Sequence, residues 1–306
     1  MLHTITYGDF ISSIPHKDSI PEQNHEYLNR YIDLCREYKV NSVIDQTIYI
    51  ANKVALTKCW WGSTFEFPIY HQTCHPNLHY SLQDILDSSD AITKLAEQLG
   101  MPFSPETFRV SDIDVCDKKY FLPLNSRRTK VYDSEADYLA SLNAKRRYKV
   151  KQVLSSTTAV STVTVNDLDF IIPTLRSLYP DELEYQYALI QSLWGIACGA
   201  YAIRTSSALG IFIPRNNELL FQAMVQNSYT NEGAKILVRS VQLARDLGLE
   251  YVEPTCKVVL ENQDIDIYKR LITNEDHNQY LMTIGTHSQV GGFKPPLCID
   301  NIWRTV

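Results

Sequence analysis

Residues 206–255 read SSALGIFIPRNNELLFQAMVQNSYTNEGAKILVRSVQLARDLGLEYVEPT, and this stretch decides the fold. Two apolar runs, 206–214 and 218–226, lie on either side of a polar turn at 215–217. Asparagine tolerates the backbone conformations that tight turns require, and apolar runs of this length are typical of strands. The segment therefore predicts a β-hairpin.

An amphipathic pattern follows the hairpin. In 234–249 the apolar residues recur at three- and four-residue steps, which predicts a helix ending at Gly248, the usual residue for a left-handed C-cap. A short strand is predicted at 251–255 and a second helix over 261–270. The order strand, strand, helix, strand, helix indicates an α/β fold.

This order of elements resembles the GNAT acyltransferase superfamily. Members of that family carry a turn with the pattern Q/R-x-x-G-x-G/A before the central helix, where backbone N–H groups and the helix N-terminus hold a pyrophosphate. The corresponding residues here, 228–233, read SYTNEG, and only Gly233 is kept. A side chain at Asn231 and the carboxylate of Glu232 both work against close approach of a coenzyme A pyrophosphate.

The resemblance also implies where an activated acyl donor binds. The strand around 222–226 presents backbone groups to the donor, and the start of the central helix lies beneath its phosphates or their replacement. The donor-binding residues implied in this way are Met224, Val225, Gln226, Gly233 and Ala234.

The final helix of the family commonly opens with Asn and carries a Tyr seven residues later, which often protonates the departing thiolate. Here Glu261 occupies the Asn position and Tyr268 follows seven residues on. The resemblance therefore implies that Tyr268 is the catalytic acid. The alternative is that Tyr268 is one of 19 tyrosines and packs its ring on a helix face.

Acyl transfer to an amine also needs a group that takes the amine proton, and a carboxylate is the usual one. Glu253 is the candidate base, because it lies on the short strand after the central helix, which lines the reaction cleft in the family. Alternation along a strand leaves open whether its side chain points to the cleft or away from it.

The chain contains two similar segments. AEQLGMPFSPETF (96–108) aligns without a gap with ARDLGLEYVEPTC (244–256), and four of the thirteen residues are identical. The similarity predicts a duplication, although a Leu-Gly pair at the end of each helix could account for part of it. Residues 117–133 form the candidate linker between the two halves.

Two such halves, the second opening with a basic helix, resemble the Fem-type aminoacyl transferases and their acetyltransferase-like relatives. In those proteins the glycine-rich turn is also eroded, and the Fem enzymes proper take an aminoacyl group from aminoacyl-tRNA. The implied architecture is α/β with two GNAT-like halves, each a mixed twisted sheet flanked by helices. The N-terminal half, with a helical extension, spans 1–120 and the C-terminal half spans 121–306.

Residues 134–154 predict one long basic helix. Lys145 and Lys149 share a face of this helix, and Arg147 lies to one side. These three residues are candidate contacts for a phosphate-bearing acyl donor, whether coenzyme A, a carrier protein or tRNA. The alternative is an ordinary solvated helix face.

Composition narrows the class of protein. The 306 residues are 44% hydrophobic and 21% charged, with a formal net charge of −6, so the surface as a whole does not attract polyanions. Neither a membrane-spanning segment nor a signal peptide is predicted, so the expected location is the cytoplasm. The run HQTCHPNLH at 71–79 matches no standard zinc spacing, and no metal site is expected.

The leading functional hypothesis is an N-acyltransferase. It moves an acyl group from acyl-coenzyme A or an acyl-carrier-protein thioester to a small-molecule amine, with no tightly bound cofactor and no membrane partner. One alternative is a Fem-type transferase that uses aminoacyl-tRNA. Another is a catalytically inactive GNAT-like binding protein, which the loss of glycine at position 231 favours and the retained Tyr268 opposes.

Overall fold

The computed structural model describes residues 4–6, 25–41, 47–58, 65–66, 82–100, 106–109, 121–154, 158–215, 217–227, 232–254 and 271–282. The chain divides into two compact units. Unit 1 comprises Met1–Leu124 and Asn278–Pro295, and unit 2 comprises Asn125–His277 and Pro296–Val306. The domain limits predicted from the sequence, 1–120 and 121–306, stay a prediction.

Unit 2 is built on a mixed sheet. Its strands follow the order β6-β11-β10-β9-β8-β7, with β12 next to β6. Strands β10 and β11 are parallel, whereas β11–β6, β10–β9, β9–β8 and β8–β7 are antiparallel. The strands are β6 (Phe121–Lys130), β7 (Ala159–Thr162), β8 (Tyr201–Arg204), β9 (Ala208–Arg215), β10 (Glu218–Gln226), β11 (Tyr251–Glu253) and β12 (Glu275–Met282). The division between the units falls within β6, after Leu124, and within β12, after His277.

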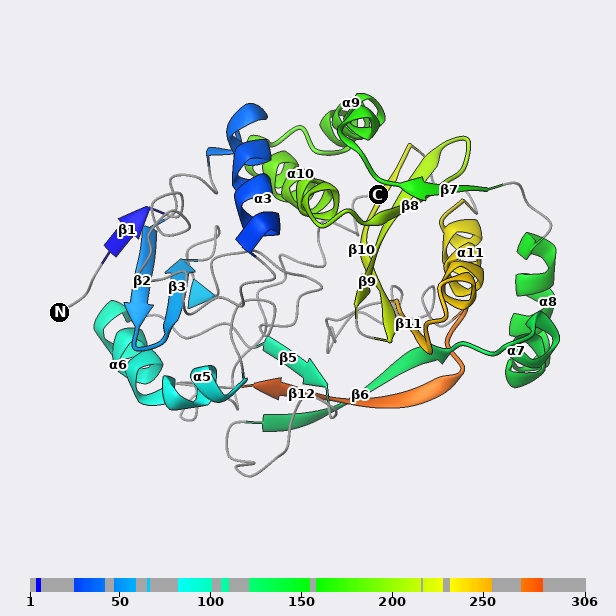
Figure 1. Cartoon of the computed structure of the whole chain (residues 1–306), viewed down its shortest axis with the longest axis horizontal. Helices are drawn as coiled ribbons and strands as arrows, with labels where there is room; N and C mark the ends of the chain where they lie inside the picture. The colour runs from blue at the N-terminus through cyan, green and yellow to red at the C-terminus, as the bar shows by residue number, and fades with distance from the viewer. Residues whose placement is uncertain are drawn as a thin grey trace. The chain divides into compact units, whose positions relative to one another are not determined.

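Helices cover both faces of the sheet in unit 2, and Figure 1 shows α10 and α11 on opposite sides of β9 and β10. A Cβ on Gly210 of β9 would lie 2.4 Å from Ile236 Cγ2 of α11, and a Cβ on Gly195 of α10 would lie 2.5 Å from Ile211 Cγ2 of β9. Glycine thus permits close packing on each face. The helices are α7 (Glu135–Ser141), α8 (Ala144–Leu154), the 3₁₀ helix η5 (Val165–Asp167), α9 (Leu168–Leu178), α10 (Glu182–Ala197) and α11 (Glu232–Asp246).

Close packing at Gly210 gives a stability prediction. Gly210→Ala is expected to lower the free energy of unfolding by about 1–3 kcal/mol, because the added methyl group overpacks the contact with Ile236, whose branched side chain is stiff. Urea denaturation measures the change. The double variant Gly210→Ala/Ile236→Ala should lose less than the sum of the two single variants, and strict additivity would contradict the assigned contact.

The predicted single helix over 134–154 is wrong, since two helices, α7 and α8, occupy this range. Leu142 has an extended backbone (φ −86°, ψ 148°) that ends α7. The side-chain oxygen of Asn143 then accepts a hydrogen bond from Arg146 N at 3.0 Å, as an N-cap residue does. The amphipathic pattern of 134–154 conceals this break, because both short helices keep the helical period.

The predicted linker, 117–133, is not an irregular connection, because most of it forms strand β6, although the division between the two units falls within it, after Leu124. The charged and polar side chains of this segment had indicated a connection between the two halves. In the sheet they have partners: Arg128 donates to Glu275 Oε1 at 2.8 Å, and Thr129 Oγ1 donates to Ile272 O at 3.1 Å. A polar strand is stable inside a sheet when its side chains are paired in this way.

Unit 1 contains a second, antiparallel sheet of order β1-β2-β3-β4. Strand β5 pairs antiparallel with the Gln279–Met282 end of β12. The elements are β1 (Thr4–Thr6), α3 (His25–Glu37), β2 (Thr47–Ala51), β3 (Val54–Lys58), β4 (Phe65–Glu66), α5 (Leu82–Asp87), α6 (Ser89–Leu99) and β5 (Glu106–Arg109).

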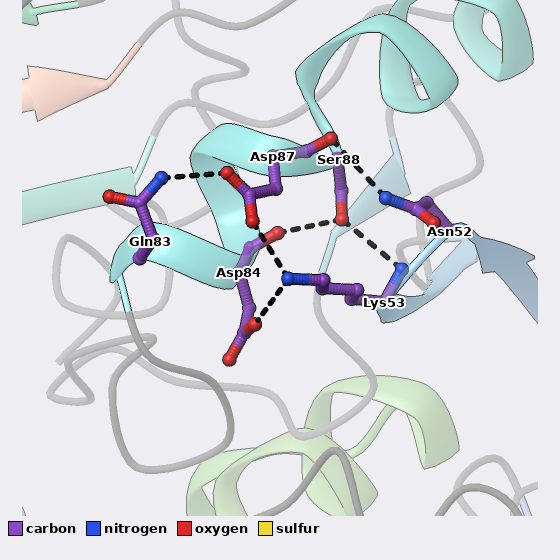
Figure 2. A network of polar contacts seen from close by, with 6 residues as sticks. All are labelled: Asn52, Lys53, Gln83, Asp84, Asp87 and Ser88. Atoms are coloured by element: carbon purple, nitrogen blue, oxygen red, sulfur yellow. Dashed lines mark hydrogen bonds and ion pairs between the residues drawn. The ribbon is translucent and has the colours of Figure 1, made fainter.

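A polar network holds the β2–β3 turn of unit 1 against the junction of α5 and α6, as Figure 2 shows. Lys53 Nζ lies 2.7 Å from Asp87 Oδ2 and 3.3 Å from Asp84 Oδ1. Lys53 N donates to the Ser88 hydroxyl at 3.2 Å, and Asn52 Nδ2 donates to Asp87 O. The hydrogen bond from Lys53 holds the pKa of Asp87 below its usual value. This network accounts for the charges at the turn as structural contacts within unit 1.

Candidate active site

The candidate site of unit 2 lies where β10 and β11 diverge. The two strands pair in parallel only over Glu218–Leu220 and Tyr251–Glu253, and β11 ends at Glu253. Residues 221–226 of β10 extend beyond β11 and remain paired with β9 on one edge. On the other edge, no strand of the described ranges pairs with them. Backbone groups along this edge are the kind of partner that an extended ligand can use.

A β-bulge in β10 lies at the point of divergence. Phe221 pairs with Phe212 and Ala223 with Ile211, so Gln222 is the extra residue. Its side chain is 2% exposed and donates from Nε2 to Gln191 O of α10 at 3.4 Å. A bulge bends its strand and increases the local twist, which turns β10 away from β11.

Glu253 lies on the same face of the sheet as the Gln222 amide. Val252 belongs to the hydrophobic cluster that contains Ile236 of α11, so alternation places Glu253 on the opposite face, toward α10. Glu253 is 1% exposed and stands beside Leu220 in the parallel register. Alternation along the sequence left the direction of Glu253 open, and its role as a base stays a prediction.

A cluster of four side chains, one of them on β11 and three on other strands of the sheet, holds β11 in place. Arg128 of β6 stacks over the Tyr251 ring, with Cζ 3.4 Å from the ring centroid. Its Nη2 lies 2.8 Å from Glu275 Oε1 of β12, and its Nη1 lies 3.7 Å from Glu218 Oε1 of β10. Tyr251 precedes Glu253 by two residues on the same face, so this cluster fixes the strand that carries Glu253.

The first turn of α11 already carries an internal anion. Glu232 is 8% exposed and its Oε1 lies 2.5 Å from Lys235 Nζ. The hydrogen bond from Lys235, followed by one from Thr205, lowers the pKa of Glu232, so the carboxylate is charged at neutral pH. A negative charge at this position opposes a second anion there, since the helix N-terminus is where a phosphate would bind.

The residues implied as donor contacts lie at the end of β10 and the start of α11. Met224 and Gln226 are half-buried and Val225 is buried, and Gly233 and Ala234 are buried in the first turn of α11. Five residues, 227–231, separate the two elements. Their role in binding a donor stays a prediction. Tyr268 lies outside the described residues, and its role also stays a prediction.

The structure separates the cations of α8 into two groups. Arg147 Nε donates to Leu139 O at 2.8 Å and its Nη2 donates to Leu142 O at 3.0 Å, so this guanidinium caps the carbonyl end of α7. Lys145 and Lys149 are exposed. Phosphate binding by the three residues stays a prediction, and Arg147 has an alternative structural role.

The contacts of the Gln222 and Arg128 side chains were not predicted from the sequence. A polar residue inside the apolar run 218–226 was the available signal for Gln222, since a strand interior seldom contains an isolated amide without a partner. Arg128 gave no comparable signal, because its partners lie up to 147 positions away in the sequence.

Within the part of the chain that the structure describes, no group of three or more His, Cys, Asp or Glu side chains could hold a metal ion. The run at 71–79 lies outside that part. The same part also contains no helix that is long and apolar enough to cross a membrane.

Solved structures of low sequence identity resemble this chain. A conserved protein of unknown function from Bacteroides thetaiotaomicron is 12% identical, with a TM-score of 0.50 over 93% of this chain and 100% of that chain. L-PGS from Bacillus licheniformis is 10% identical (TM-score 0.49; 91% and 96% covered). An acetyltransferase from the GNAT family of Colwellia psychrerythraea is 10% identical (TM-score 0.39; 92% and 99% covered).

At these identities the likeness concerns the fold and not the activity. The predicted α/β fold is confirmed, and unit 2 has the predicted mixed sheet flanked by helices. No protein-family model matches the sequence, and no curated protein matches it.

Proposed function

We propose that this protein is an N-acyltransferase whose reaction takes place where β10 and β11 diverge. The observation that carries the proposal is the position of Glu253. It is a buried carboxylate at the last residue of β11, on the sheet face that also carries the Gln222 amide, where the edge of β10 is no longer paired with β11. A buried carboxyl group beside an unpaired strand edge is a candidate for a chemical role, which supports the proposal.

The donor binds along β10. Backbone N–H and C=O groups of 223–226 on the edge opposite β9 hydrogen-bond to the extended part of the donor, as an added strand would. This contact positions the thioester carbonyl near the level of Leu220 and Glu253, which are partners in the parallel register. Holding the two reactants in this way contributes much of the rate enhancement.

The chemical step exchanges a C–S bond for a C–N bond. The amine nitrogen attacks the thioester carbonyl carbon, and the Glu253 carboxylate takes the proton that the nitrogen loses. The carbonyl re-forms as the C–S bond breaks, and the thiolate leaves with a proton from an acid, for which Tyr268 is the predicted source. The products are an amide and a thiol, and solvent restores the protonation of both side chains.

The donor is a thioester that does not place a pyrophosphate at the start of α11. Glu232 already supplies a negative charge at the start of α11, paired with Lys235, where a coenzyme A pyrophosphate would need to bind. An acyl group on a carrier protein avoids this repulsion, because the carrier contributes its own protein contacts. An aminoacyl ester of tRNA is the second donor to be tested.

Mass spectrometry tests the proposed activity. The purified full chain is incubated with a pool of small amines and, in separate reactions, with pooled acyl-coenzyme A species, acyl carrier proteins and charged tRNA. An amide product that depends on the protein and on the carrier protein is expected. Absence of an amide product with all three donor classes would contradict the proposal and favour a binding protein.

The charge of Glu232 predicts weak binding of coenzyme A. Acetyl-coenzyme A is expected to bind with a Kd above about 100 μM, which corresponds to roughly 5–6 kcal/mol. Glu232→Gln removes the internal anion and releases Lys235, so calorimetry should show binding about tenfold tighter, or about 1.4 kcal/mol. The control is Glu250→Gln, which removes an exposed carboxylate elsewhere in unit 2. Micromolar affinity in the wild type would assign the protein to the coenzyme A-dependent acetyltransferases.

A further inference from the structure

Helix α8 presents a one-sided positive surface. Its sequence, AKRRYKVKQVL, contains five cationic residues and no acidic one, in a chain with a net charge of −6. The two arginines are directed at the protein: Arg146 donates to Thr273 O, and Arg147 donates to carbonyls at the end of α7. The three lysines are exposed, and they are Lys145, Lys149 and Lys151.

Tyr148 lies among these lysines and is 65% exposed. It is three residues from Lys145 and adjacent to Lys149, so Lys145, Tyr148 and Lys149 lie close together on the outer part of the helix. Val150 is fully buried in the cluster that includes α11, which fixes α8 on the body of unit 2. Figure 1 shows α8 beyond α11, on the side away from β9 and β10. An exposed tyrosine ring is typical of the centre of a protein interface, and the lysines around it make this surface positive, which suits an acidic partner.

We infer that Lys145, Tyr148 and Lys149 of α8 form the docking surface for an acidic carrier protein that presents the acyl group on its phosphopantetheine arm. The inference rests on the proposed function, because it names the donor of that reaction. Lysine ammonium groups pair with carboxylates as mobile point charges. The Tyr148 ring supplies the apolar centre that a small interface needs, and its hydroxyl adds a hydrogen bond.

The same observations disfavour RNA as the partner. Lysines at three positions neutralise at most about three phosphates, and the affinity for a single strand then falls with salt with a log–log slope of only about −2, which is typical of weak contacts. The arginines, which bind phosphate with two parallel hydrogen bonds, are used inside the protein.

Fluorescence anisotropy of labelled octanoyl acyl carrier protein tests the docking surface with the full chain. Lys145→Glu/Lys149→Glu should weaken binding at least tenfold at low salt, and binding to the wild type should weaken as salt is raised. Tyr148→Ala should weaken binding with little change in its salt dependence. The matched control is Lys39→Glu/Lys94→Glu, which makes the same charge change on exposed residues of unit 1 and should bind like the wild type.

Three results would overturn the inference. The wild type could fail to bind the carrier protein, the α8 charge reversal could leave its affinity unchanged, or uncharged tRNA could bind the lysine surface more tightly than the carrier. Binding and turnover separate the two claims. Carrier binding that follows the α8 charges without an amide product keeps the docking surface and contradicts the proposed function. Amide formation that is unchanged by the α8 charge reversal keeps the proposed function and contradicts the docking surface.

Discussion

Glu253→Gln is expected to lower kcat by about 10²- to 10⁴-fold, the range for loss of a positioned general base. The amide side chain has nearly the same shape but cannot accept the amine proton. Glu253 is 1% exposed, and glutamine fits the same space, so the replacement should leave the fold intact. The KM for the donor should change little, since the donor is bound through the β10 backbone. Steady-state kinetics of amide formation measures both constants.

A matched control is available three residues earlier. Glu250→Gln makes the same chemical change on an exposed side chain, whose carboxylate accepts a hydrogen bond from Asn217 at 3.1 Å. Its kcat should remain within about twofold of the wild type, because an exposed contact of this kind contributes little. Equal kcat values for Glu253→Gln, Glu250→Gln and the wild type would contradict the role of Glu253 as the general base.

Arg128→Met is expected to lower the free energy of unfolding by about 2–4 kcal/mol, since it removes one partner of a largely buried charge cluster. The Arg128 side chain is 17% exposed and Glu218 is 3% exposed, so the carboxylate loses a cation where water cannot fully replace it. The stacking on Tyr251 is lost as well, although methionine retains some contact with the ring. Urea denaturation followed by circular dichroism measures the loss.

Arg239→Met serves as the control for Arg128. Its ion pair with Asp246 spans 3.8 Å, and both side chains are partly exposed. The expected change is at most about 0.5–1 kcal/mol, as for other surface ion pairs. If Arg128→Met and Arg239→Met destabilise the protein equally, the cluster around Tyr251 does not hold β11 in place.

Local patterns were sufficient to predict the hairpin and the helix of unit 2. Strands β9 and β10 pair over the predicted runs, and α11 spans Glu232–Asp246 within two residues of the predicted start. Gly248 has the left-handed backbone (φ 70°) that the predicted C-cap requires. These features depend on residues within one or two turns of each other, so the sequence contains their signals.

Contacts between distant segments were not predictable in this way. The charged residues of β6 indicated a linker, because the partner that stabilises Arg128 in the sheet, Glu275, lies 147 positions further along the chain. The break between α7 and α8 depends on a cap at Asn143 that the helical period conceals. A local pattern cannot show whether a polar side chain will find such a partner.

The candidate site was predicted in part. The sequence indicated Glu253 as a candidate base on a short strand, but alternation alone gives only relative faces. Its direction follows from Val252, which packs in the cluster with α11. The bulge at Gln222 was missed, because a bulge adds one residue to a strand without changing its composition.

Hydrogen exchange detected by mass spectrometry tests most directly whether the donor binds where β10 and β11 diverge. The probe is an acyl carrier protein whose acyl group is attached through an amide, so that it cannot be transferred. At saturation, peptides covering 221–227 and 251–254 should exchange at least about tenfold more slowly, while β7 and β8 (159–162 and 201–204) should be unchanged. Unchanged exchange at 221–227 with the probe bound would contradict the proposed site.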